Sequence, residues 1–180
     1  NDKIYKETDS SGNDFLSDVC IKWENAAIKF EDIGVRTVRL RFGVVLSEKG
    51  GALKKMLLPT KLGFGSALGS GNQFLPWIHI DDLIGIIAKS ISEENMKGAY
   101  NAVAPSFSNY NEFAKTMAEV MDKPFFMPNV PSLILKLIFG EMSKVILEGS
   151  KISSKKLIDS GYIFHFPNLK EALSDLLNNT

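Results

Sequence analysis

The sequence is poor in cysteine and histidine and has no excess of either charge. Cys20 is the single cysteine among 180 residues, and there are two histidines, so neither an internal disulfide nor a cysteine-cluster metal site is available. Lys plus Arg and Asp plus Glu both number 21, which gives no electrostatic basis for binding nucleic acid or an anionic membrane. The composition therefore predicts a globular protein of the reducing cytoplasm, with no bound metal.

Two further features are missing. The longest strongly apolar stretch, 131–140, contains Lys136 and is much shorter than the roughly 20 apolar residues that cross a bilayer. No Gly-x-x-Gly-x-x-Gly turn, which would cradle a dinucleotide phosphate, occurs in these 180 residues. The composition is otherwise ordinary, with 44% apolar residues, and predicts a folded domain with a hydrophobic core.

The first quarter of the sequence reads as a helix followed by a strand. Apolar residues recur at helical spacing from Phe15 to Phe30, with Asn13 as the expected cap and Gly34 as the stop. The stretch 35–42 then alternates apolar and polar residues, and 43–46 is wholly apolar, as in a buried strand. A helix followed by a core strand is typical of an α/β fold.

The middle of the sequence continues this pattern. A short helix is expected over 52–62, and the glycines that follow it predict loops. The stretch 74–80 is predicted to be extended, with Asp81 and Asp82 capping the next helix. A further short strand is expected over 99–103.

The remainder is predicted to be mainly helical. Asn109 and Glu112 are spaced as a capping box, three prolines interrupt the chain between 124 and 131, and 132–147 has a helical composition. Asn168 and Glu171 are expected to open the last helix. We therefore expect three regions: 1–48 with the end of a Rossmann-type domain, 49–108 with substrate-side loops returning to the core, and 109–180 as a helical region.

Four motifs occur in this sequence in the same order as in one protein family. They resemble the atypical, epimerase-like branch of the extended short-chain dehydrogenases, and the likeness runs over almost the whole chain. The matching segments are Asp14-Phe15-Leu16-Ser17-Asp18-Val19-Cys20-Ile21-Lys22-Trp23-Glu24, Arg41-Phe42-Gly43-Val44-Val45-Leu46, Gly69 to Asp82, and Gly140-Glu141-Met142.

The resemblance implies an α/β fold: the carboxyl-terminal part of a Rossmann-type doubly wound domain plus a mainly helical carboxyl-terminal region. It also implies an NADP or NAD cofactor. In this family the phosphate-cradling turn lies upstream of the matched motifs, so the cofactor is expected to be held mainly by an amino-terminal half outside these 180 residues. The chain is accordingly expected to be a fragment that is inactive by itself.

Two positions depart from the superfamily pattern. The usual catalytic helix carries Tyr and Lys four residues apart, and aligning Glu24 with the acidic residue of that motif places Leu16 and Cys20 at those positions. In sugar-nucleotide epimerases an Arg pairs with the substrate diphosphate, and Leu75 stands at the matching position. The resemblance thus does not extend to the usual dyad or to a nucleotide-sugar substrate.

Phe42, Gly43 and Val44 are predicted to border the cofactor, because ligands of open α/β sheets gather at the carboxyl ends of strands. The alternative is an ordinary buried strand. A small substrate is predicted to contact four residues of the following loop and strand, with plain turn chemistry, a core tryptophan and a structural histidine as the alternatives. These four are Asn72, Gln73, Trp77 and His79.

The function expected from the sequence is that of an NAD(P)-dependent oxidoreductase or epimerase-like enzyme acting on an unidentified small molecule. Two alternatives remain open. The missing Tyr and Lys fit a regulatory protein that binds NAD(P)H without catalysis. The helical region from Asn109 would instead suit a protein-interaction domain.

Overall fold

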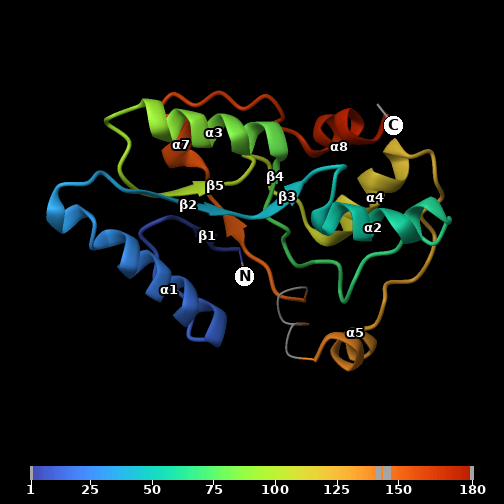
Figure 1. Ribbon diagram of the computed structural model, residues 1–180. Helices are drawn as coiled ribbons and strands as arrows, with labels where there is room; N and C mark the ends of the chain where they lie inside the picture. Colours follow the sequence, from blue (N-terminus) through green and yellow to red (C-terminus); the bar gives the residue numbers. More distant parts are fainter. Residues whose placement is uncertain (1, 141–142, 144–146, 179–180) are drawn as a thin grey trace.

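The strands form three parallel pairs. The computed structural model describes residues 2–140, 143 and 147–178. Within them β1 pairs with β6, β2 with β5, and β3 with β4, always in parallel (Figure 1). Parallel pairing needs a crossover between partners, which confirms the predicted α/β class. The strands are β1 (Ile4–Tyr5), β2 (Val38–Phe42), β3 (Val44–Leu46), β4 (Trp77–His79), β5 (Gly98–Ala102) and β6 (Lys151–Ile152).

Helices supply the crossovers and cover the strands. In Figure 1, α3 and α7 lie on one side of β2 and β5, and α1 lies on the other side. The described helices are α1 (Phe15–Ile28), the short 3-10 helix η1 (Glu31–Ile33), α2 (Gly51–Lys61), α3 (Ile80–Ser92), α4 (Tyr110–Val120), α5 (Ser132–Phe139), α7 (Lys155–Asp159) and α8 (Leu169–Asn178). Within the described ranges, no helix is both long and apolar enough to span a membrane.

The local helix signals are largely confirmed. Asn109 and Glu112 form the predicted capping box at the start of α4. Gly34 ends η1 with a left-handed backbone, φ 80°. The cap of α1 is Asp14, whose carboxylate accepts a hydrogen bond from the Ser17 amide, so the prediction of Asn13 was wrong by one residue. Both side chains can cap, and the start of the helix decides which one does.

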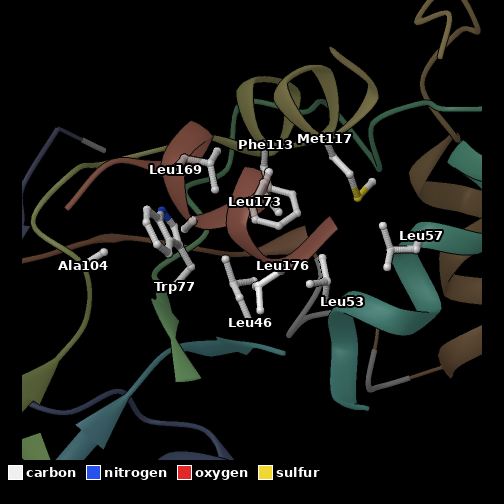
Figure 2. Packing of buried hydrophobic residues seen from close by; sticks show 11 residues of the cluster. Leu46, Leu53, Leu57, Trp77, Ala104, Phe113, Met117, Leu169, Leu173 and Leu176 are labelled. Carbon is white, nitrogen blue, oxygen red and sulfur yellow. The ribbon is translucent and has the colours of Figure 1, made fainter. Parts of the chain in front are cut away.

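The main hydrophobic cluster joins β3 and β4 to three helices. Figure 2 shows Trp77 of β4 packed among side chains of β3, α2, α4 and α8. Trp77 is 1% exposed, and Phe113 and Leu173 are fully buried. A second cluster around Ile78, Ile86 and Leu157 fills the space between the strands, α3 and α7. The last helix is therefore an integral part of the core that supports β4.

The start of α3 differs from the sequence prediction. The cap is His79, whose Nδ1 accepts the Asp81 amide at 3.1 Å, and neither Asp81 nor Asp82 serves as the cap. Asp82 is fully buried, and its carboxylate accepts bonds from the carboxyl-terminal segment. The donors are the Tyr162 hydroxyl at 3.0 Å, the His165 amide at 2.9 Å and the Phe166 amide at 3.0 Å.

The predicted helix at 15–30 forms, but its apolar side chains are not part of the described core. No residue of α1 is buried; Phe15 is 78% exposed and Trp23 is 73% exposed. Glu24 fastens α1 to β2 through Arg41, with an Nη2 to Oε2 distance of 2.8 Å, and this contact lowers the pKa of the Glu24 carboxyl.

Other predicted segments are shorter than expected. Within the stretch 74–80, which is predicted to be extended, Trp77–His79 is a strand, Phe74 forms an isolated bridge with Asn109, and Ile80 already begins α3. The helix predicted over 132–147 begins with α5 at Ser132, and α5 ends at Phe139 with Gly140 as its cap. Within the rest of the predicted stretch, 141–142 and 144–146 lie outside the described residues.

Gly43, between β2 and β3, is packed directly against the backbone of Pro76. A Cβ atom at Gly43 would lie 2.2 Å from the Pro76 carbonyl oxygen, far inside van der Waals contact. The neighbouring Val44 amide donates to the same oxygen at 2.8 Å. Only glycine allows β2 to continue into β3 while it touches the segment that leads into β4.

Replacing Asp82 with alanine should destabilise the protein by about 3 kcal/mol, because three donors of the 162–166 segment lose a charged acceptor in a buried site. Thermal unfolding followed by circular dichroism measures the loss. Asp81→Ala is the control, since that side chain is 65% exposed and contributes mainly through the helix dipole, less than about 1 kcal/mol. Equal losses in the two variants would contradict the role given to Asp82.

Gly43→Ala should cost at least about 2 kcal/mol of unfolding free energy, because the added methyl group meets a backbone atom that cannot rotate away. Urea denaturation measures this change. Gly50→Ala is the matched control: nothing lies within 4 Å of the Cβ position there, and its φ of 169° is ordinary extended backbone. A Gly43→Ala variant as stable as Gly50→Ala would rule out the close approach.

Candidate functional site

The residues predicted to border the cofactor lie where β2 ends and β3 begins. Phe42 is paired with Ala102, the last residue of β5, so both parallel strands end at the same edge. The Phe42 side chain is 59% exposed at that edge, whereas Val44 is partly buried against the main cluster. The edge thus offers an aromatic side chain next to a backbone position, Gly43, that has no side chain.

The loop between α2 and β4 is held by its own polar groups. Gln73 Nε2 donates to the Leu68 carbonyl at 2.9 Å, and the Ser70 hydroxyl donates to Gln73 Oε1 at 3.3 Å. The Gln73 carbonyl accepts the Tyr110 amide at 3.0 Å. Asn72 is exposed at the turn. Gln73 therefore shapes the loop, and Asn72 is the more accessible of the two predicted substrate contacts.

Trp77 and His79, the other two predicted substrate contacts, are each 1% exposed. Trp77 belongs to the main cluster, where its Nε1 has no hydrogen-bond partner among the described residues. The His79 ring stacks on Phe166 with centroids 3.9 Å apart and caps α3. These surroundings fit the alternative predictions for the two residues, a core tryptophan and a structural histidine.

A narrow crevice lies beside the strand edge, next to Pro76. Its free volume of about 10 Å³ accommodates about one water molecule. Ser106 Oγ is buried there without a hydrogen-bond partner in the described part of the chain. The ammonium of Lys151, on β6, lies 4.7 Å from the Phe74 ring centre. The lining consists of Phe74, Leu75, Pro76, Val103, Ala104, Ser106, Phe107, Ser108, Ser150, Lys151 and Ile152.

A larger cavity of about 240 Å³ lies beyond the carboxyl ends of β3 and β4. His79, Asp81 and Asp175 meet there, each with a possible ligand atom for a metal ion, all within 4.8 Å of one another. However, His79 Nδ1 accepts the Asp81 amide, so the proton of the neutral ring is on Nε2, which faces Asp175 Oδ2 at 3.3 Å. That tautomer has no free lone pair for a metal ion; the geometry favours a histidine–carboxylate contact.

The positions of the superfamily's catalytic pair are accessible on α1. Leu16 is 54% exposed, and Cys20 is exposed and unpaired with any other cysteine. The two side chains do not reproduce a tyrosine–lysine pair, because leucine carries no proton to transfer and cysteine carries no positive charge.

Sequence reasoning did not single out Ser106, Lys151 or Asp175. Each lies far along the chain from the residues that it meets, and no local motif marks any of the three. The sequence around Lys151, with Glu148 three residues before it and Lys155 four residues after it, gives no signal that would have directed attention to Lys151.

Comparison with known proteins gives consistent results. Residues 130–176 match a domain family described as a domain of unknown function, DUF1731. The epimerase family protein SDR39U1 of mouse is 42% identical over 97% of this chain, and the epimerase family protein SAR0825 of Staphylococcus aureus is 45% identical over 92% of it.

Solved structures extend the likeness to three dimensions. The crystal structure of human epimerase family protein SDR39U1 (isoform 2) with NADPH has a TM-score of 0.92 and 37% identity over 99% of this chain. A nucleoside-diphosphate sugar epimerase of Corynebacterium glutamicum has a TM-score of 0.78 and 28% identity, also over 99% of the chain.

The chain spans 60% of the length of the mouse protein and 55% of that of the staphylococcal one. The parallel strand pairs, the matched carboxyl-terminal domain and the agreement of sequence and structure lead to one conclusion. Over nearly its whole length the chain is similar to the carboxyl-terminal part of epimerase family proteins, and these findings support an atypical, epimerase-like short-chain dehydrogenase.

Proposed function

We propose that the protein containing this chain is an NAD(P)-dependent oxidoreductase or epimerase-like enzyme with a small-molecule substrate. The observation that carries the proposal is the edge where β2 and β5 end together, with Phe42 exposed and the crevice beside it. Ligands of open α/β sheets bind at such edges. The human relative with a TM-score of 0.92 was crystallised with NADPH, which supports a nicotinamide cofactor for this chain as well.

The nicotinamide ring would lie against Phe42, Gly43 and Val44. A dinucleotide also needs an anchor for its pyrophosphate, usually backbone amides at a Gly-rich turn before a helix. These 180 residues contain no such turn, so most of the cofactor affinity would come from the part of the protein outside them. Whether NADP or NAD is preferred would be decided there too.

The substrate would lie between the strand edge and the loop that carries Asn72 and Gln73. Direct contact of substrate with Trp77 and His79 stays a prediction; their burial favours supporting the loop and strand from behind. Leu75 lines the crevice with an apolar side chain, where a diphosphate would favour a bidentate cation. We therefore propose a substrate other than a nucleotide sugar. A cytoplasmic location likewise stays a prediction.

A second candidate is a regulatory protein that binds NAD(P)H without turning it over. The exposed Leu16 and Cys20 at the positions of the usual catalytic pair favour it. In that case the cofactor site would be retained, and no group on α1 would transfer a proton.

The full-length protein should bind NADPH or NADH with micromolar affinity or better, about 8 kcal/mol, and the isolated 180-residue chain should bind neither measurably. Isothermal titration calorimetry on both proteins tests this prediction. Micromolar binding to the isolated chain would contradict it. Steady-state hydride transfer to carbonyl compounds then separates an enzyme from a regulatory protein, since the latter consumes no cofactor.

Nucleotide sugars should not stabilise the full-length protein. A ligand at 100 times its Kd raises the unfolding free energy by about 2.7 kcal/mol, an amount readily detected by a thermal shift, so a panel of UDP- and dTDP-sugars should leave Tm unchanged. NADPH is the positive control in the same assay. A saturable rise of Tm with any nucleotide sugar would mean that another cation, such as Lys54 or Lys61, takes the role that Leu75 cannot fill.

A further inference from the structure

The crevice beside the strand edge has the features of a carboxylate-binding site. We propose that Lys151 and Ser106 anchor the carboxylate of a small organic-acid substrate, with Ser106 holding one oxygen inside the crevice and the Lys151 ammonium neutralising the charge at its edge. This inference rests on the proposed function, because it names the chemical class of substrate for that same site.

The charge of the lining favours an anion. Among the residues that line the crevice, Lys151 is the one that carries a formal charge. Its side chain is 21% exposed, and its ammonium lies over the face of Phe74, which restricts where the cation can be. A partly desolvated ammonium in a restricted position attracts an anion more strongly than a fully solvated one does.

The structure also shows that a carboxylate can occupy this position. The Asp2 carboxylate accepts a hydrogen bond from Lys151 Nζ at 3.0 Å, and this bond lowers the pKa of the Asp2 carboxyl. The Asp2 side chain is fully exposed, with an accessibility of 101%, so solvent reaches this carboxylate, while the pairing of β1 with β6 holds its backbone near Lys151. A substrate carboxylate can take the same place by exchange with Asp2.

Ser106 provides the second contact. Its Oγ is buried in the crevice and lacks a hydrogen-bond partner among the described residues, which is costly for a polar group. The crevice holds about 10 Å³, enough for a single oxygen atom but not for a sugar ring. A carboxylate fits both constraints, since one oxygen accepts from the Ser106 hydroxyl while the other faces the ammonium.

The location next to Gly43 gives the anchor a role in the reaction. Pro76 lines the crevice and touches Gly43, where the nicotinamide is proposed to lie. A carboxylate held at Ser106 and Lys151 would therefore place the adjoining carbon atoms of the substrate toward the cofactor. Lys151 and Ser106 are binding and positioning residues in this proposal, and no proton transfer is assigned to them.

The test compares small 2-oxo acids with their amides, which differ in charge but hardly in shape, as substrates or ligands of the full-length protein with NADPH. The acids should bind at least tenfold more tightly than the amides. Lys151→Met should abolish this preference, Lys151→Arg should restore most of it, and Ser106→Ala should raise KM for the acid while the NADPH Kd stays unchanged. Lys155→Met, an exposed lysine paired with Asp159, is the matched control and should retain the preference.

The outcomes separate the two proposals. Loss of NADPH binding in the unmodified protein would overturn the proposed function itself. If NADPH binds but acids and amides are equivalent, or if Lys151→Met keeps the preference for acids, the carboxylate anchor is wrong and the cofactor site stands. Inorganic phosphate that competes with neither the acid nor NADPH would agree with the anchor; phosphate binding tighter than the acids would overturn the carboxylate assignment.

Discussion

The buried carboxylate of Asp82 is the interaction on which the rest of the structure depends. It accepts hydrogen bonds from a hydroxyl and two amides of the 162–166 segment. These bonds hold Phe166 against the ring of His79. Burial and the neighbouring Asp82 raise the pKa of the Tyr162 phenol, so that this hydroxyl remains a donor. From there the chain enters α8, whose Leu173 packs in the cluster around Trp77. The carboxyl-terminal domain thus supports β4 from behind.

This support reaches the candidate site through the backbone. Trp77 continues the segment of Leu75 and Pro76, and Pro76 lies against Gly43 at the edge where the cofactor is proposed to bind. The same short segment brings Leu75 into the crevice, which the β6 residue Lys151 also lines. A few residues of extended chain therefore connect the hydrophobic core with the proposed binding site. At Gly43 there is no room for an added side chain.

The predictions that succeeded rest on local physics. Asn109 and Glu112 satisfy the first amides of α4 themselves, and the spacing of apolar residues reports a helix or a strand without knowledge of its partner. The failures involve partners that lie far along the chain. Asp82 has the sequence context of a helix cap, yet its carboxylate oxygens accept hydrogen bonds from residues 162–166. His79 therefore caps the helix instead. For α1 the spacing predicts the helix, but none of its residues is buried in the described structure. That Ser106 and Lys151 line the same crevice depends on tertiary packing and has no sequence signature.

The pairing of β1 with β6 has a consequence for how the chain is made. Ile4 is paired with Lys151, so the first strand is synthesised long before its partner exists. At a synthesis rate of about 5–20 residues per second, the partner is made roughly 7–30 s later. During translation the backbone N–H and C=O groups of β1 that pair with β6 therefore have no strand partner. The hydrogen bonds between these two strands form only after α5 and the residues that follow it have been synthesised.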